Sequence, residues 1–299
     1  MIYLEKKQFQ EMIEHCQKEC PKEACGILAG SRGRSKSFSP VRSSGAIYGT
    51  ICRMNPTATP VDDEPEGSIP KIVTKVYKMV NTSENPETCY FMEPTEQLKV
   101  FKEMRHLRIE MLGIYHSHSQ TPAYPSQRDC EMAFYPEASY VIISLKDFNK
   151  PEVRAFKIIE GKIEEEKIVV RKNILFVCVE NSCRSQMAEA IVNNLYWQKF
   201  SAHSAGSKPS GIINSLAIEV MKEIGIDISK QKPKTLTQDM VEESELVITM
   251  GCIKGCPLFK GKKIINWDIE DPAGKPLEKF REIRDIIAKK LKKGLNEGK

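Results

Sequence analysis

The chain has 299 residues, a formal net charge of +5 and 40% hydrophobic residues, which is enough for two ordinary domain cores. No apolar run approaches the roughly 18 residues of a membrane span, and the first residues lack the pattern of a signal peptide, so no membrane partner is expected. The ten cysteines therefore predict functional thiols in a reducing cytoplasm rather than the disulfides of a small secreted protein.

The first predicted elements are a helix at about residues 7–20 and, after it, a segment at residues 21–30 that contains Glu23 and runs into small and apolar residues. Taken alone, Glu23 would be an N-cap or a surface acid. The polar, proline-containing stretch at residues 52–70 then indicates an inserted surface loop.

Two histidines alternate along a strand predicted at residues 113–118, so His116 and His118 project from the same face. Ser126 and Asp129 follow shortly after this strand. Neutral imidazoles and one carboxylate are the ligands of a four-coordinate Zn²⁺ that keeps one position open for water. A lone His-x-His would be weak evidence, because paired histidines also occur as core or surface residues. With the serine and the aspartate added, the pattern predicts a catalytic metal site.

These residues resemble the motif of the JAMM (MPN-plus) metallopeptidases, position for position, and the resemblance covers most of residues 1–165. The family also has a glutamate on the helix before the first core strand, and Glu23 stands in that position. The resemblance implies an α/β sandwich with a mixed sheet over residues 1–168. Ser119 departs from the pattern, since many prokaryotic members carry proline there. The other matching positions are Asn81, Tyr90, a helix near residues 95–105 and a strand at residues 140–145.

The resemblance implies a zinc-dependent isopeptidase or peptidase. His116, His118 and Asp129 would hold Zn²⁺, which lowers the pKa of its bound water from about 15.7 towards 7. Glu23 would take the proton of this water as general base and return it to the leaving amine. Ser126 would hold the developing oxyanion or orient the substrate carbonyl. The implied substrates are ubiquitin-like proteins with a Gly-Gly tail, including sulfur-carrier proteins. A non-catalytic docking module is the alternative.

The domain boundary is predicted near residues 160–172, without a Gly/Ser linker, and the second domain covers residues 171–299. Residues 161–170 are typical of a last, charged edge strand that leads directly into it. The basic excess of the chain lies in this second part and includes Lys289, Lys290, Lys292 and Lys293. Because no aromatic residues are interleaved with these lysines, a solvated helix end is favoured and no nucleic-acid partner is expected.

A second site begins at a buried strand, residues 173–178, which is followed by a loop and a helix predicted at residues 186–200. Cysteine, five residues and arginine on such a loop form a cradle for a tetrahedral oxyanion, because backbone N–H groups and a helix N-terminus favour an anion. This field and Arg184 favour the nucleophilic thiolate of Cys178. An inert buried cysteine is the alternative. The residues expected to line the cradle are Glu180, Asn181, Ser182, Cys183, Arg184 and Ser185.

Over about residues 172–291 this part resembles the low-molecular-weight tyrosine phosphatases and, within them, the thiol-coupled arsenate reductases. Residues 181–189 are similar to the reductase branch, since the phosphatases usually have proline after the serine. The resemblance implies a four-stranded parallel α/β sandwich and gives Asp271, in an Asp-Pro pair, the role of general acid. Glu180 departs from the pattern, because many relatives have glycine there, and it puts a negative charge beside the anion site.

Cys252 and Cys256 separate the reductase from the phosphatase in this resemblance. Cys178 would attack arsenate, Cys252 would attack Cys178 as arsenite leaves, and Cys256 would carry the disulfide to a thioredoxin-like reductant. Bacterial thioredoxin-linked members space the last two cysteines more widely. One alternative is a phosphotyrosine-type phosphatase, which would bind phosphate in the cradle and whose cysteine pair would protect Cys178 from oxidation. The other alternative is a structural zinc site at Cys252 and Cys256, but the sequence of this domain has no second pair of cysteines that would complete it. The sequence thus predicts a bifunctional cytoplasmic enzyme.

Overall fold

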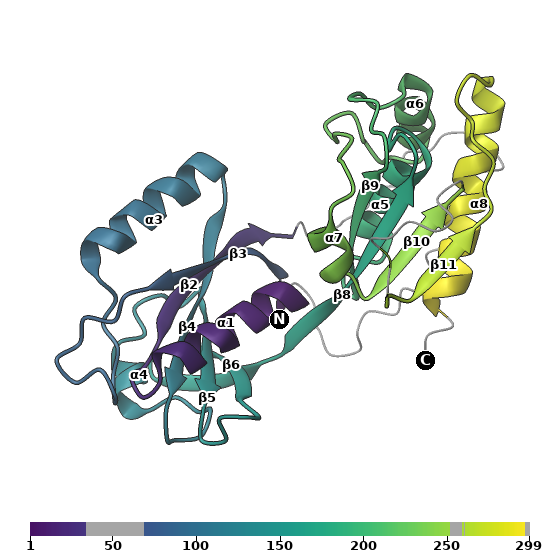
Figure 1. The fold of residues 1–299 in the computed structure, drawn as a ribbon. Coiled ribbons are helices and arrows are strands. Elements are labelled where there is room, and N and C mark those ends of the chain that lie inside the picture. Colours follow the sequence, from purple (N-terminus) through teal and green to yellow (C-terminus); the bar gives the residue numbers. More distant parts are fainter. Residues whose placement is uncertain (34–68, 252–258, 260, 297–299) are drawn as a thin grey trace. The chain divides into compact units, whose positions relative to one another are not determined.

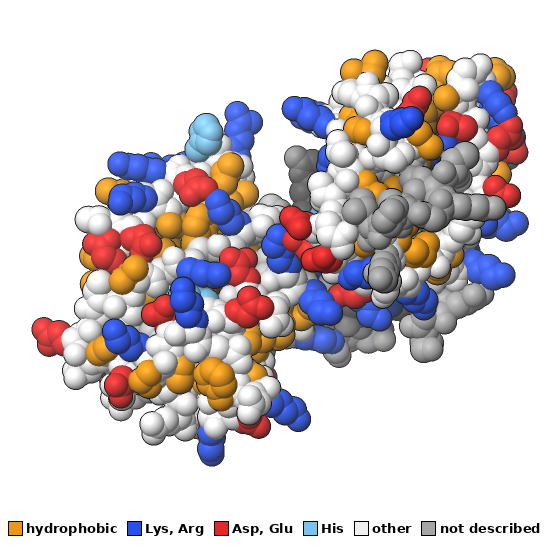
Figure 2. Space-filling view, viewed as in Figure 1, with side chains coloured by type: hydrophobic (Ala, Val, Ile, Leu, Met, Phe, Trp, Pro, Cys, Tyr) orange, Lys and Arg blue, Asp and Glu red, His pale blue; other side chains and the backbone are white. Residues whose placement is uncertain are grey.

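The computed structural model describes residues 1–33, 69–251, 259 and 261–296, which divide into two compact units (Figure 1). The first unit ends at Val170 and the second continues from Arg171. Most of the surface loop predicted at residues 52–70 lies outside the described residues. Among those described, no helix combines the length and the apolar character that a membrane span requires. On the face seen in Figure 2, basic and acidic side chains are interspersed over each unit.

A mixed β-sheet forms the centre of the first unit, as expected. Its strands follow the order β1-β3-β2-β4-β5-β6-β7. The pairs β1/β3 and β4/β5 are parallel, and the other neighbouring pairs are antiparallel. The elements are β1 (Ile2–Glu5), α1 (Lys6–Glu19), β2 (Cys25–Arg32), β3 (Lys71–Met79), α3 (Pro94–Leu107), β4 (Glu110–His118), α4 (Gln127–Glu131), β5 (Ser139–Ser144), β6 (Glu152–Ile159) and β7 (Lys162–Glu166).

Helices cover both faces of this sheet. Successive residues of a strand point to opposite sides, so each strand contributes side chains to the core under each helix layer. On one face, α1 contributes Met12 to the core cluster that contains Tyr115 of β4. On the other face, α3 contributes Met104 to the cluster that contains Ile114 of the same strand. The result is the predicted α/β sandwich, in which β4 lies between β2 and β5.

The single strand predicted at residues 161–170 is wrong in one respect, because the structure has two strands there. β7 pairs with β6 at the edge of the sheet, and Lys167 separates it from β8 (Ile168–Cys178). The carbonyl oxygen of Lys167 accepts a hydrogen bond from the N–H of Ile2 on β1 at 3.0 Å. At Lys167 the chain therefore stops pairing with β6 and contacts β1. The alternation of charged and apolar residues along residues 161–170 does not predict this change of the neighbouring strand.

The described residues of the second unit form a sheet of four parallel strands in the order β9-β8-β10-β11, as predicted. Phe176 of β8 belongs to the core cluster that α5, α6 and α8 cover, and Val177 to the cluster that contains Val241 of α7. Helices thus lie on both faces. The elements after β8 are α5 (Arg184–Leu195), β9 (Phe200–Gly206), α6 (Ser215–Glu223), α7 (Gln238–Glu242), β10 (Leu246–Met250), β11 (Ile264–Trp267) and α8 (Leu277–Asn296).

The helix predicted at residues 186–200 is shorter than expected, and α5 ends at Leu195. Asn193 stands near its C-terminal end. The Asn193 side chain donates to the carbonyl oxygen of Ala202 at 2.8 Å and accepts from the Ala202 N–H at 2.9 Å. Asparagine side chains form hydrogen bonds that compete with those of the helical backbone. The two hydrogen bonds between Asn193 and Ala202 connect the end of α5 to β9. The contact joins residues that periodicity cannot relate.

Candidate active sites

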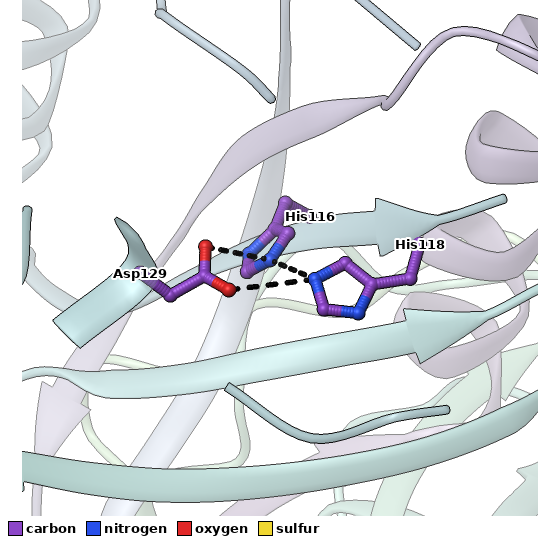
Figure 3. Close-up of side chains that lie close together, drawn as sticks. All are labelled: His116, His118 and Asp129. Atoms are coloured by element: carbon purple, nitrogen blue, oxygen red, sulfur yellow. Dashed lines mark hydrogen bonds and ion pairs between the residues drawn. The ribbon is translucent and has the colours of Figure 1, made fainter. Parts of the chain in front are cut away.

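The structure brings the three predicted metal ligands together in the first unit (Figure 3). His116 and His118 come from β4 and Asp129 from α4. The Nε2 atoms of the two histidines lie 3.1 Å apart. Asp129 Oδ1 is 3.2 Å from His116 Nε2, and Asp129 Oδ2 is 3.4 Å from His118 Nε2. One potential ligand atom from each residue lies within 4.8 Å of the others.

The protonation of these groups fits a cation. His118 Nδ1 lies 3.0 Å from the carbonyl oxygen of Pro122, and because a carbonyl only accepts, Nδ1 is the donor and the neutral ring would turn its Nε2 lone pair to the cluster. Burial alone would lower the pKa of His118, but hydrogen bonds with Asp129 and Pro122 raise it, so a cation at Nε2 would displace a proton there. Burial lowers the pKa of His116, against the opposing effect of Asp129, and favours neutral imidazole. Burial alone would raise the pKa of Asp129, but hydrogen bonds with both histidines hold it far below its usual range. Two imidazoles and a carboxylate are a donor set for Zn²⁺.

Ser126 holds Asp129 in place at the start of α4. It is the N-cap, and its Oγ accepts from the Asp129 N–H at 3.2 Å. In return, Asp129 Oδ2 accepts from the Ser126 N–H at 2.7 Å and from the Ser126 hydroxyl at 2.6 Å. This reciprocal pair is a capping box. In this conformation the hydroxyl proton of Ser126 is directed to Asp129, and its role towards a substrate oxyanion stays a prediction.

Glu23 lies beside this cluster but not on a helix, so that part of the expectation is wrong. α1 ends at Glu19, because Pro21 has no N–H and its ring disfavours helical backbone in the residue before it. Glu23 stands in the extended segment before β2 and is 6% exposed. Burial raises the pKa of Glu23 to about 7, while His118 lowers it and Asp129 raises it further.

A cavity of about 580 Å³ opens onto the cluster. Part of its wall is apolar and includes Phe91 and Phe134, whose side chains are 48% and 68% exposed. The polar part contains four of the predicted site residues, Glu23, His118, Ser126 and Asp129. The predicted general base, Glu23, and two of the potential metal ligands therefore line one solvent-accessible cavity.

Tyr90 has a contact that the sequence did not predict. Its ring stacks on that of His116 with centroids 4.6 Å apart and an interplanar angle of 28°. The sequence identified Tyr90 only as a position that matches the family, without a role. Tyr115, in contrast, is fully buried in the core, and its hydroxyl lies 2.8 Å from His15 Nδ1.

In the second unit, Cys178 ends β8 and is 2% exposed. Its Sγ accepts a hydrogen bond from the N–H of Asn181 at 3.2 Å and lies 2.9 Å from Ser185 Oγ. Ser185 Oγ in turn accepts from Asn181 Nδ2 at 2.8 Å, so the Ser185 proton is free to point to the sulfur. Burial raises the pKa of the nearby Cys183 to about 12 and keeps that thiol neutral.

Backbone N–H groups of residues 207–214 hold the carbonyl oxygens of the cysteine loop from outside. The pairs are Ser207 N to Cys178 O at 3.3 Å, Lys208 N to Val179 O at 2.9 Å, Ser210 N to Glu180 O at 3.0 Å and Asn214 N to Ser182 O at 3.1 Å. Since carbonyl and N–H point oppositely across a peptide plane, this arrangement favours N–H groups directed into the loop, which is also a feature of anion-binding nests. A Cβ on Gly206 would lie 2.5 Å from Val179 O, so only glycine fits there.

Arg184 and Asp271 meet beside this loop. Arg184 is 5% exposed; its Nη1 donates to the carbonyl oxygen of Ile269 at 2.8 Å and its Nη2 to Asp271 Oδ2 at 2.5 Å. Glu180 is exposed and its carboxylate accepts from Ser182 Oγ at 3.2 Å. The charge of Glu180 therefore lies towards solvent.

Cys252 and Cys256 lie outside the described residues. Gly251, which directly precedes Cys252, is described and has a φ of +80°. A Cβ at Gly251 would lie 2.9 Å from Arg184 Nη1, so the chain passes close to the arginine of the cysteine loop just before the first of these thiols.

Residues 5–159 match the family model described as prokaryotic homologs of the JAB domain, and residues 173–297 match low molecular weight phosphotyrosine protein phosphatase. Arsenate reductase 2 of Staphylococcus epidermidis is 40% identical over 120 residues, 39% of this chain and 91% of that protein. An arsenate reductase of Staphylococcus aureus is 39% identical over 122 residues, 40% of this chain and 92% of that protein. A solved thioredoxin-dependent arsenate reductase from Corynebacterium glutamicum is 36% identical, with a TM-score of 0.36, and the match covers 41% of this chain and 61% of that one.

Proposed function

The chain belongs to the prokaryotic JAB-domain family through residues 5–159 and to the low molecular weight phosphotyrosine protein phosphatase family through residues 173–297, and from this we propose a bifunctional enzyme. The first unit is a zinc-dependent peptidase or isopeptidase that cleaves at the tails of ubiquitin-like or sulfur-carrier proteins. The second unit reduces arsenate to arsenite and receives its electrons from a thioredoxin-like reductant.

One observation carries the proposal for the first unit: two imidazoles and a carboxylate converge within 3.4 Å of one another beside the cavity that also contains Glu23. When bound, Zn²⁺ would polarise the scissile carbonyl and acidify a water molecule. Glu23 accepts the proton of the attacking water and passes it to the leaving amine. A pKa raised to about 7 suits a base at neutral pH. The exposed aromatic wall supports an extended peptide tail as the occupant.

Metal analysis tests this half directly. The purified protein should retain zinc, measured by inductively coupled plasma mass spectrometry, and should hydrolyse a Gly-Gly isopeptide. His116→Ala should lose both properties, because it removes a ligand from an already buried site. Cys178→Ser, which alters only the second unit, is the matched control and should keep both. Wild-type protein without zinc or hydrolysis would contradict the peptidase and favour a docking module.

The hydrogen bonding around Cys178 carries the proposal for the second unit. The Cys178 thiolate attacks arsenic and forms a sulfur–arsenic bond, while one arsenate hydroxyl takes a proton from Asp271 and leaves as water. The Cys252 thiolate then attacks Cys178 Sγ; a disulfide forms and the electron pair of the broken bond stays on arsenic, which departs as arsenite. Cys256 takes over the disulfide, and the reductant restores the thiols. The position of Gly251 beside Arg184 supports Cys252 as the second thiol.

A phosphatase is the second candidate, favoured by the contact of Asp271 with Arg184 at 2.5 Å. In that reaction Asp271 would protonate the leaving group of a phosphate ester bound at Cys178. Both reactions use the same nucleophile and the same anion cradle, so they differ only in what happens after the first attack.

Cys252→Ser distinguishes the two reactions. We expect it to abolish arsenate turnover, because the covalent arsenic adduct cannot be resolved, and to leave any hydrolysis of an aryl phosphate largely intact. Arsenate-dependent NADPH oxidation with thioredoxin and thioredoxin reductase measures the first activity, and release of nitrophenol measures the second. If both activities fell equally, the relay would be excluded.

A further inference from the structure

Asn81, two residues after the end of β3, is a hydrogen-bonding centre beside the first site. Its Oδ1 accepts two backbone N–H groups and its Nδ2 faces three carbonyl oxygens. The acceptor contacts are Ser83 N at 3.0 Å and Phe91 N at 3.1 Å. The donor contacts are the carbonyl oxygens of Glu23 at 2.8 Å, Cys89 at 3.1 Å and Pro86 at 3.4 Å. This division fixes the orientation of the amide, because a flipped amide would place oxygen against carbonyls and N–H against N–H.

The backbone of Glu23 and Ala24 is held on two sides. On the side of Asn81, the Glu23 carbonyl accepts from Asn81 Nδ2, and the Glu23 N–H donates to Pro86 O at 2.6 Å. On the other side, the Ala24 N–H donates to Ser117 Oγ at 2.8 Å, and the Ala24 carbonyl accepts from the Ser117 N–H at 3.0 Å. Ser117 stands between the two histidines on β4. The segment that carries the general base is thus anchored to the metal-ligand strand and to the Asn81 loop.

The loop from Ser83 to Phe91 also reaches the metal ligands. Asn81 accepts hydrogen bonds from both ends of this loop, and the loop carries Tyr90, which stacks on the ring of His116. One side chain therefore connects the backbone of Glu23 with the segment that covers His116.

We propose that Asn81 is a positioning residue for the peptidase reaction: its amide fixes the Glu23 segment relative to His116, His118 and Asp129. This inference rests on the proposed peptidase function of the first unit. Asn81 acts through Glu23 and the loop, not on the substrate. A displacement of the base by about 1 Å is enough to slow a reaction by about 100-fold, so a tie of this kind has a measurable kinetic effect.

Asn81→Asp is the sharpest test. The variant keeps the shape of the side chain and the oxygen that accepts from Ser83 and Phe91, but it sets a second oxygen against three carbonyls. We expect kcat to fall about 10- to 100-fold, with KM and zinc content within about twofold of wild type. Thr82→Val is the matched control, since Thr82 directly precedes the loop and its Oγ1 donates to Phe91 O at 3.1 Å. It should leave kcat unchanged.

Amide hydrogen exchange gives a readout that does not depend on catalysis. In Asn81→Asp, peptides that contain Glu23 and Ala24 should exchange faster than in wild type, while peptides from β6 and β8 should not change. Asn81→Ser, which is uncharged and too short to reach Glu23, should give the same kinetic and exchange results and replaces Asn81→Asp if that variant does not fold.

Three outcomes would overturn the proposal: wild-type kcat in both variants, unchanged exchange at Glu23, or, in Asn81→Ser, a loss of zinc and of exchange protection throughout the unit. A wild-type protein that hydrolyses no peptide would instead refute the proposed function. The exchange experiment would still test whether Asn81 holds the backbone of Glu23.

Discussion

Cys178→Ser should lower arsenate turnover by at least about 10³-fold, because the serine hydroxyl is a far weaker nucleophile than a thiolate and cannot form the disulfide of the relay. The loss should appear in arsenate-dependent NADPH oxidation with thioredoxin and thioredoxin reductase. Serine is nearly isosteric and can keep the contacts with Asn181 and Ser185, so the variant should fold normally.

Two controls separate this effect from general damage. The hydrolytic activity of the first unit should be the same in Cys178→Ser and in wild type. Cys20→Ser, at a half-buried cysteine of the first unit, should leave arsenate turnover unchanged. If Cys178→Ser kept turnover close to that of wild type, another cysteine would be the nucleophile and the role assigned to the Cys178 loop would be wrong.

Glu23→Gln should reduce peptide hydrolysis by about 10²- to 10⁴-fold, the usual contribution of a general base, without loss of zinc. The glutamine keeps the size of the side chain but cannot accept the proton of the attacking water. In wild type, we expect the acid limb of kcat between the ordinary carboxyl pKa of 4.5 and the value of about 7 to which burial raises Glu23, because a bound cation favours the carboxylate. This limb should be absent from the residual activity of Glu23→Gln.

The same variant should make the metal-free protein more stable at alkaline pH. Folding raises the pKa of Glu23 from 4.5 to about 7, so the folded state binds this proton more tightly than the unfolded chain does. The resulting stabilisation is complete below pH 4.5 and is lost as the pH rises through 7, a change of about 3 kcal/mol. Glu23→Gln should therefore raise the Tm of the chelator-treated protein at pH 8 and hardly change it at pH 4. A lower Tm at pH 8 would show that the carboxylate is a structural group.

The sequence was sufficient to predict the two folds and the clustering of His116, His118 and Asp129. Strand periodicity puts alternate histidines on one face, and the motif supplies the aspartate. The place of the loop after Cys178 was equally predictable, because a buried strand is followed directly by the start of a helix. In both cases the information is local.

What the sequence did not predict depends on contacts between distant residues. The tie from Asn81 to Glu23 joins positions 58 residues apart, and the contact of Arg184 with Asp271 joins positions 87 apart. Glu23 was assigned to a helix because a motif fixes the order of residues but not where Pro21 ends the helix. The orientation of Glu180 depends on its contact with Ser182, which no pattern encodes.

The elements that carry the His-His-Asp cluster differ in how easily they open. β4 is paired on both sides, with β2 and β5, and is buried from Leu112 to His118. α4 has five residues, and none of its side chains is buried. Local opening costs least where few apolar contacts are lost, so thermal fluctuations should withdraw Asp129 long before they disturb the two histidines. The lifetime of the complete His-His-Asp cluster is therefore set by the opening of α4, which is little more than one helical turn, and not by the stability of the sheet that contains β4.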